Sequence, residues 1–495
     1  MKKYSLELTV FLSGAIVMML ELTGSRILAP FVGTSTFIWT SLIGVILASL
    51  SFGYYHGGIK ADADPSQKRL GQILFLAGVS IGVGALINQS ILQYLVNIFP
   101  GIRWPAVVSA TILFGPPAYL LGMVSPQAVR IRMTDLKTSG STIGRLYALS
   151  SLGSIVGTFL VGFYLMAWVG SRNILFILSG LSFLLASFNY KNKDNFFALI
   201  LFIVAPFVQS FGKNNLLKIQ DTEYNSVQVF TAPHPYPTSK VCRVLKVGNE
   251  YSSGMFLDSD SLAFQYSKFY KLIYYFNQKP TKTLLIGGGA YSVPKYFQKT
   301  NPNLSMDVLE IDPALTQIAQ AKFNFNPEER IVPIHEDGRT FLNHNKKKYD
   351  AVMCDAYHSL FNIPFHLVSL EAIEKMSDAL NPNGVLIVNL LSPIKGPNRD
   401  LVHSMVKTCG EVFPYIRAFK PRLEVPDERV QNIILVCMKT KNPVLPGSAS
   451  NEINEMLAKE INLKNLGWEN GIVLKDDYAP VEHYAEKMLG SYFQR

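Results

Sequence analysis

Long apolar runs dominate the first 212 residues of this 495-residue chain. Most of them approach the ~20 residues that an α-helix needs to cross a bilayer. They lie at roughly 5–30, 37–58, 70–95, 105–127, 143–168, 173–190 and 195–211. Because lipid offers no partner for backbone polar groups, runs of this length form helices. We therefore expect residues 1–212 to be a membrane domain with about six or seven transmembrane helices.

Basic residues gather between these runs. Residues 1–212 contain 14 Lys and Arg against 6 Asp and Glu, which accounts for most of the net charge of +10. Such loop charge reflects membrane topology, so we expect a lipid bilayer and no nucleic acid as a partner. The loops after the second, fourth and sixth runs are the richer ones, which predicts a cytoplasmic amino terminus. The expected location is the inner (plasma) membrane, with several passes.

The run at 195–211 decides on which side the rest of the chain lies. It is short and interrupted by Pro206. If it does not cross the bilayer, six crossings leave the remainder in the cytoplasm; if it does, the remainder lies outside. We expect a cytoplasmic domain. A removable signal peptide is not expected, because the first run is followed by others and lacks a small-residue cleavage site.

One spacing inside the fifth run indicates how the helices pack. Gly153 and Gly157 are separated by three residues. Small residues at this spacing allow two helices to approach closely in a membrane. We expect this pair to serve helix packing.

The pattern changes to short β-type runs at about Asp221. Residues 213–280 are expected to be a small antiparallel β-subdomain and linker. Residues 281–495 alternate strands with helices, which predicts a Rossmann-like domain, an α/β doubly wound sheet of the methyltransferase type. The four cysteines are scattered without a CxxC pair, so no metal site is predicted.

The stretch "TLLIGGGAYSVPKYF", from Thr283 to Phe297, is a nucleotide-binding candidate. Gly287, Gly288 and Gly289 end a buried strand and precede a helix, where a ligand can meet the backbone at the helix amino terminus. The next strand ends in Glu310, at a spacing that suits an acid accepting hydrogen bonds from ribose hydroxyls. Together these residues predict a nucleoside site.

Two further strand ends complete the expected site. Asp337 and Gly338, in "HEDGRTFL", either meet an adenine amino group or form an ordinary turn. Asp355 ends the strand in "YDAVMCDAYHS", which leaves a carboxylate at the crevice where the reactive end of the ligand should lie.

The motif order "LLIGGG", "VLEID", "HEDGRTFL", "YDAVMCDAY" and "LNPNGVLIVNL" resembles the spermidine synthase family of polyamine aminopropyltransferases. The segments "GPPAYLLGMVSPQAVR" and "LYALSSLGSIVGTFLVG" in the first half, and "LKDDYAPVE" near the end, resemble the fused membrane/spermidine synthase-like proteins. The resemblance implies transfer of an aminopropyl group from decarboxylated adenosylmethionine to an amine such as putrescine, releasing methylthioadenosine and using no metal. It implies that Asp355 orients the amine and receives its proton.

Three positions depart from that family. Ala290 follows the glycines where the family usually has Asp, and His358 stands where it typically has a second Asp. His358 is either an alternative proton acceptor or a solvent-facing loop residue. The amine-binding segment has no clear counterpart, although Tyr266 and Tyr270 could line a pocket, and we add Tyr357 as a third substrate-binding candidate.

Two other functions stay open at this point. Loss of the acid at Ala290 would suit intact adenosylmethionine, which retains a carboxylate, and hence a methyltransferase. The large membrane half would also suit a non-enzymatic transporter or sensor that responds to polyamines or nucleosides. A homodimer is one assembly that we leave open.

Overall fold

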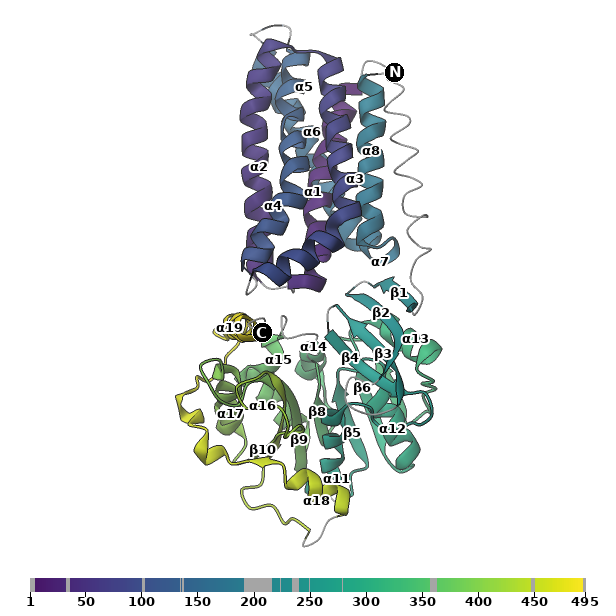
Figure 1. Ribbon diagram of the computed structural model, residues 1–495, viewed down its shortest axis with the longest axis vertical. Helices are drawn as coiled ribbons and strands as arrows, with labels where there is room; N and C mark the ends of the chain where they lie inside the picture. The colour runs from purple at the N-terminus through teal and green to yellow at the C-terminus, as the bar shows by residue number, and fades with distance from the viewer. Residues whose placement is uncertain are drawn as a thin grey trace. The chain divides into compact units, whose positions relative to one another are not determined.

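The computed structural model describes the following residues: 5–32, 36–99, 103–133, 135, 138–190, 216–222, 224–233, 240–248, 250–277, 279–356, 363–446 and 450–492. The predicted seventh run, 195–211, and the predicted site residues Tyr357 and His358 lie outside this part of the chain. The chain forms two compact units (Figure 1). One comprises Met1–Asn214 and Gln220–Ser226, and the other comprises Asn215–Ile219 and Val227–Arg495.

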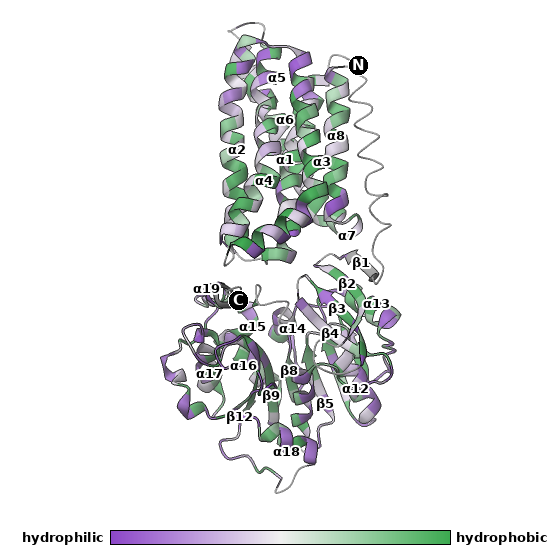
Figure 2. Ribbon diagram, in the orientation of Figure 1, coloured by the Kyte–Doolittle hydropathy of each residue, from purple (hydrophilic) through white to green (hydrophobic). Residues whose placement is uncertain are grey.

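The first unit is helical. Its elements are α1 (Ser5–Val32), α2 (Thr36–Ala63), α3 (Gln67–Ile98), α4 (Arg103–Gly122), α5 (Val124–Arg132), α6 (Ser139–Leu160), the π-helical turn η3 (Val161–Leu165), α7 (Met166–Trp168) and α8 (Ser171–Asn189). With α4 and α5 taken as one span, and α6 together with η3 as another, six helices in the described residues are long and apolar enough to cross a bilayer. Figure 2 shows apolar residues along these helices. They coincide with the first six predicted runs.

Glycines allow α1 and α6 to pack backbone to backbone. A Cβ atom added at Gly153 would lie 1.8 Å from the carbonyl oxygen of Phe11, and one at Gly157 would lie 2.6 Å from that of Ala15. Gly14 on α1 faces α6 in the same way, with the Ser150 oxygen 2.2 Å from its added Cβ. The small-residue spacing therefore serves close helix packing.

We predict that Gly153→Ala destabilises the helical unit by about 1–3 kcal/mol, because the added methyl group must push α1 and α6 apart. Gly144→Ala is the matched control, since it lies on α6 with nothing within 4 Å of its added Cβ. The control should be neutral or slightly stabilising, because alanine favours a helix. Thermal unfolding of the detergent-solubilised full chain measures both, and equal melting temperatures would contradict the packing role.

A small antiparallel sheet opens the second half of the chain. Its strands are β1 (Leu216–Asp221), β2 (Ser226–Pro233), β3 (Val241–Val247) and β4 (Glu250–Phe256), in the order β1-β2-β3-β4. Alternate residues of β2 and β3 are buried, as expected for a sheet with one covered face. Short helices follow: α10 (Gln265–Lys268), η5 (Phe269–Leu272) and α11 (Ile273–Phe276).

The main sheet has eight strands in the order β12-β10-β11-β9-β8-β5-β6-β7. Their bounds are β5 (Lys282–Ile286), β6 (Ser305–Leu309), β7 (Ile331–Ile334), β8 (Tyr349–Cys354), β9 (Leu380–Ser392), β10 (Tyr415–Phe419), β11 (Gln431–Met438) and β12 (Glu460–Ile461). The five strands β5 to β9 are parallel, as predicted, whereas β10, β11 and β12 add an antiparallel edge that the sequence did not reveal. The fold is Rossmann-like.

Helices cover both faces of this sheet (Figure 1). They are α12 (Ser292–Thr300), α13 (Pro313–Lys322), α14 (Gly338–His344), α15 (Phe365–Val368), α16 (Leu370–Ala379), α17 (Asp400–Val412), α18 (Asn451–Leu457) and α19 (Val481–Tyr492), with the short turns η6 (Leu463–Asn465) and η7 (Trp468–Asn470). Residues alternate between the two cores: Leu284 and Ile286 of β5 pack with α16 and α17, and Leu285 packs with α11 and α12. This alternation is the period of two that defines a strand.

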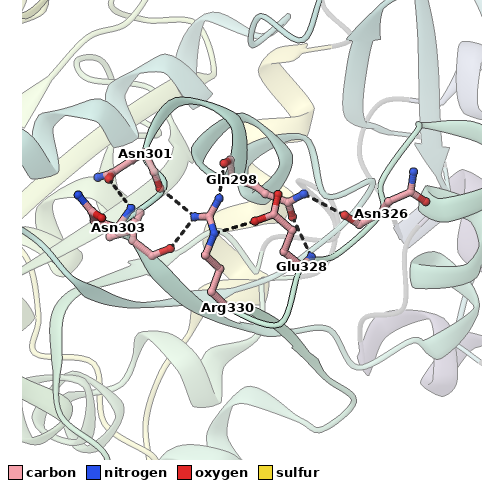
Figure 3. A network of polar contacts seen from close by, with 7 residues as sticks. Gln298, Asn301, Asn303, Asn326, Glu328 and Arg330 are labelled. Atoms are coloured by element: carbon pink, nitrogen blue, oxygen red, sulfur yellow. Dashed lines mark hydrogen bonds and ion pairs between the residues drawn. The ribbon is translucent and has the colours of Figure 1, made fainter.

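Arg330 fixes the far end of α12, the helix that follows the three glycines (Figure 3). Its Nη1 donates to the carbonyl oxygens of Asn301 and Leu304 at 2.8 and 2.9 Å, and its Nη2 donates to that of Gln298. Glu328 accepts from its Nε at 2.8 Å. These bonds tie the last turn of α12 and the segment after it to the start of β7. The helix is thereby anchored at the opposite end from the glycine loop.

The order of the parallel strands determines where a ligand should bind. From β5 the chain moves outward through β6 and β7, then crosses to β8 and β9 on the other side. The strand order therefore reverses between β5 and β8. In open α/β sheets ligands bind beyond the carboxyl ends of the strands at such a reversal.

Candidate active site

The glycine loop begins where β5 and β8 come into contact. Gly287 has φ of 100°, and an added Cβ would lie 2.4 Å from the carbonyl oxygen of Asp355. Only glycine allows the two strand ends to approach this closely. Gly289, with φ of 53°, is constrained similarly, because its added Cβ would lie 2.7 Å from the Ser253 hydroxyl oxygen.

Tyr291 closes the loop in a conformation that is unusual for its residue type. Its φ is 56°, in the left-handed region that a bulky side chain rarely adopts. The side chain is fully buried, stacks on Phe325 with ring centroids 4.4 Å apart, and shares a hydrogen bond of 2.7 Å with the Thr316 hydroxyl. Strained backbone of this kind persists only where the surroundings hold it. No motif in the sequence indicated the role of Tyr291.

Glu310 turns its carboxylate onto the loop. Its Oε2 accepts hydrogen bonds from the backbone N–H groups of Gly288 and Gly289 at 3.0 and 2.9 Å, and its Oε1 accepts from that of Asp312 at 3.1 Å. Burial raises the pKa of the Glu310 carboxyl to about 7, and these three bonds limit the rise. A carboxylate offers about four acceptor positions, so one remains for a ligand.

The structure gives Asp337 and Gly338 local tasks at the start of α14. The Asp337 Oδ1 accepts from the backbone N–H of Thr340 at 2.9 Å, which is a helix cap, and its Oδ2 lies 3.4 Å from the Nε2 of His366. Gly338 packs against β5, since an added Cβ would lie 2.8 Å from a methyl group of Ile286. Both residues also line the cavity described below.

Asp355 lies immediately beyond β8 and is partly buried. Its backbone N–H donates to the Ile286 oxygen at 2.8 Å, and its Oδ1 accepts from the Asn389 side-chain amide at 2.8 Å. Burial raises the pKa of the Asp355 carboxyl to about 6, and the Asn389 amide and the nearby hydroxyls of Tyr270 and Tyr266 keep it from rising further. The carboxyl is therefore mostly ionised at pH 7 yet remains able to take up a proton.

Two cavities meet at Asp355. The larger has a volume of about 300 Å³ and is lined by the glycine loop, Glu310, Asp337 and Gly338, with His366 and Glu482 also at its wall. The smaller has about 20 Å³, room for about one water molecule. Gly287 and Asp355 border both cavities.

The smaller cavity contains one predicted tyrosine and several serines. Tyr266 lines it, together with Ser253, Ser267 and Ser292. Tyr270 is fully buried, and its hydroxyl lies near the Asp355 carboxyl.

Ala290 contacts Ser253 on strand β4 of the small sheet. Its backbone N–H donates to the Ser253 hydroxyl at 3.1 Å, and the Ala290 side chain is buried. Sequence reasoning missed Ser253, Asn389 and Glu482, because strands and a helix far apart in the chain bring them to the site. Only the lone polar Asn389 within the apolar run "VLIVNLL" offered a signal.

The glycine loop, Glu310 and Asp355 surround a crevice at the strand reversal of a Rossmann-like sheet. Residues 268–443 match the family profile described as "Spermine/spermidine synthase domain". Residues 268–443 therefore carry a spermine/spermidine synthase domain, and six long apolar helices precede it among the described residues.

Parts of the chain are similar to known proteins. A polyamine aminopropyltransferase of Vibrio vulnificus is 29% identical over 244 residues, which are 48% of this chain and 77% of that protein. The eEF1A lysine and N-terminal methyltransferase of Xenopus laevis is 28% identical over 196 residues, 38% of this chain but only 27% of that protein. The crystal structure of a probable spermidine synthase from Corynebacterium glutamicum is 19% identical, with a TM-score of 0.41, covering 57% of this chain and 94% of that one.

The buried carboxyl of Asp355 should cost stability at neutral pH. The pKa of the Asp355 carboxyl is about 6 in the folded protein, above the ordinary 3.8. The stability that protonation of this carboxyl contributes is therefore complete below pH 3.8 and is lost as the pH rises through 6. We predict that Asp355→Asn raises the free energy of unfolding at pH 8 by about 3 kcal/mol, with no gain near pH 4.

Asp350, at the other end of β8, is a control of opposite sign. Partial burial opposes the change, but hydrogen bonds from Thr281, Asn381 and Lys282 outweigh it and lower the pKa of Asp350. Asp350→Asn should therefore lose stability at pH 8. Unfolding of the solubilised full chain between pH 4 and 8, followed by near-ultraviolet circular dichroism, measures both, and destabilisation by Asp355→Asn at pH 8 would refute the assignment.

Proposed function

We propose that this protein is a membrane-integrated aminopropyltransferase. It transfers the three-carbon aminopropyl group of decarboxylated adenosylmethionine to an amine, putrescine or a related polyamine, and releases methylthioadenosine. The observation that carries the proposal is the position of Asp355, whose side chain borders both cavities. A transfer between two small molecules requires one group that reaches both of them.

The larger cavity suits the nucleoside part of the donor. Its volume of about 300 Å³ lies at the lower end of the range for small-molecule sites. The ribose would take the acceptor position that remains on Glu310, and the adenine would lie toward Asp337 and Gly338. The sulfonium would then lie beside Gly287, where the absence of a side chain lets its carbon chain reach Asp355.

The transfer itself is a displacement at carbon. The lone pair of the neutral acceptor amine forms a bond to the aminopropyl carbon that carries the sulfonium, and the carbon–sulfur bond breaks with its electron pair going to sulfur. The product ammonium then passes one proton to the Asp355 carboxylate. Since a sulfonium is already a good leaving group, positioning of the two reactants supplies most of the acceleration.

The smaller cavity suits the amine end of the acceptor. Tyr266 and three serine hydroxyls provide neutral polar contacts, and Asp355 provides the charge. The buried hydroxyl of Tyr270, which lies near Asp355, supports a further polar contact there. Tyr357 and His358, which follow β8 in the sequence, remain predicted contributors to substrate binding and proton transfer.

The six apolar helices support membrane integration. With the basic loops on the side of the amino terminus, six crossings would put the transferase domain in the cytoplasm, where adenosylmethionine is available.

A methyltransferase is the second candidate, and Ala290 is the observation that favours it. The residue after the three glycines is buried and apolar, and its N–H is bonded to the neutral Ser253 hydroxyl. With alanine at this position, there is no carboxylate to pair with the amine of decarboxylated adenosylmethionine. There is also none to repel the carboxylate of intact adenosylmethionine.

The by-product distinguishes the two reactions. We predict that purified full-length protein, incubated with both donors and a panel of polyamines, produces methylthioadenosine in proportion to the aminopropylated amine. Liquid chromatography with mass spectrometry measures both. Accumulation of adenosylhomocysteine alone, with a methylated amine, would overturn the proposal in favour of the methyltransferase.

Asp355→Asn separates catalysis from binding. We expect turnover to fall by about 10²–10⁴-fold, the usual contribution of a positioned acid or base, while methylthioadenosine binds within a few-fold of the wild-type affinity. In the wild type, kcat should rise with pH through about 6 as Asp355 ionises. Unchanged turnover in the variant would contradict the role of Asp355, whereas unchanged transport flux in a protein without turnover would favour a transporter.

A further inference from the structure

A chain of side-chain amides extends from Asp355 across the sheet. Asn389 on β9 donates from its Nδ2 to the Asp355 Oδ1 at 2.8 Å, and Asn432 on β11 donates from its Nδ2 to the Asn389 Oδ1 at 3.0 Å. The strands β8, β9 and β11 are consecutive neighbours in the sheet. The three side chains thus form one continuous hydrogen-bonded line behind the cavities.

The middle amide lies in apolar surroundings. Asn389 is 3% exposed, and its strand neighbours Val388 and Leu390 are buried in the core, as is Ile434, its partner on β11. Burying an amide without partners costs several kcal/mol, whereas both polar atoms of Asn389 are paired here. A packed core has no need of this amide, which indicates a task at the site.

An amide can present either its oxygen or its nitrogen, and its other partner decides which. Asn432 donates to the Asn389 oxygen, so the Asn389 NH₂ group is the one that faces Asp355. With the opposite orientation, an amide oxygen would face the carboxylate and repel its charged form. Asn432 therefore determines whether the Asn389 amide attracts or repels the Asp355 carboxylate, although Asn432 itself does not bond to Asp355.

The other titratable groups facing Asp355 carry no compensating charge. Burial keeps Tyr270 neutral by raising its pKa well above 10, and raises the pKa of Cys354 to about 12. Tyr266 contributes a hydroxyl from α10. Among the described residues, the Asn389 amide is thus the group that most favours the ionised carboxylate in this environment.

We propose that Asn389 and Asn432 are positioning residues of the transferase, in which Asn432 orients the Asn389 amide so that it holds the Asp355 carboxylate ionised and fixed between the two cavities. The catalytic part of this inference rests on the proposed function of Asp355. The electrostatic part does not, and it can be measured without any turnover.

The experiment compares two variants of Asn432 with a matched control. Asn432→Leu removes the donor to the Asn389 oxygen at nearly constant volume. Asn432→Asp replaces this donor with an acceptor, so that the Asn389 NH₂ group should face residue 432 and the Asn389 oxygen should face Asp355. Asn381→Leu is the control, because Asn381 also lies on β9 and donates at 2.8 Å to an aspartate of β8, Asp350, but at the opposite end of the strand. The full-length protein is used throughout.

Infrared difference spectroscopy against pH measures the ionisation of Asp355, whose protonated C=O band is identified by its loss in Asp355→Asn. We expect the pKa of Asp355 to rise by about one unit in Asn432→Leu, the value of one charged hydrogen bond, and by more in Asn432→Asp. The acid limb of the kcat profile should move by the same amount, and the control should change neither.

Each outcome has a distinct meaning. If the pKa of Asp355 in both Asn432 variants equals its value in the wild type, the proposal is overturned. A shifted titration with an unshifted kcat profile would support the amide chain and overturn the role of Asp355 as proton acceptor. If Asn432→Leu does not fold, the isosteric Asn432→Asp still decides.

Discussion

The close approach of β5 and β8 at their carboxyl ends is the constraint on which the rest of the site depends. Gly287 touches the backbone of Asp355, and the Asp355 N–H donates to the Ile286 oxygen. This contact places the glycine loop and the carboxylate at one cavity. Any side chain at Gly287 would separate them, because its Cβ would lie 2.4 Å from the carbonyl oxygen of Asp355. Their contact lies where the strand order reverses, which is where ligands bind in open α/β sheets.

The charge of the site follows from its burial. Glu310 is buried and Asp355 is partly buried, and desolvation raises the pKa of Glu310 to about 7 and that of Asp355 to about 6. Functional sites commonly carry such perturbed carboxyls, since the same burial that destabilises a charge makes it responsive to a substrate cation or proton. Hydrogen bonds from Asn389 to Asp355 and from the loop N–H groups to Glu310 favour the ionised form of both carboxyls and limit the rise of their pKa values.

Sequence reasoning found those parts of the site that are encoded locally. The glycines after a buried strand, and an acid at the end of the next strand, follow from spacing along the chain, and the structure brings Gly287, Glu310 and Asp355 around one cavity. The six apolar runs and the packing of Gly153 against α1 were predictable for the same reason.

The remaining features depend on tertiary contacts. Ser253 reaches Ala290 only because the small sheet packs on the loop, and Asn432 reaches Asn389 only because β11 inserts antiparallel beside β9. Asp337 had two interpretations from the sequence, and the structure adds its use as a helix cap. The left-handed backbone of Tyr291 had no signal, since its burial against Phe325 comes from a distant strand connection.

The most direct test of the account is an experimental structure of the full-length protein with methylthioadenosine and an amine bound together. We expect the nucleoside in the cavity of about 300 Å³, with its sulfur toward Asp355, and the amine nitrogen on the side of Tyr266 within hydrogen-bonding distance of the Asp355 carboxylate. A nucleoside bound elsewhere, or an amine that does not contact Asp355, would contradict the claim that this carboxylate joins the two sites.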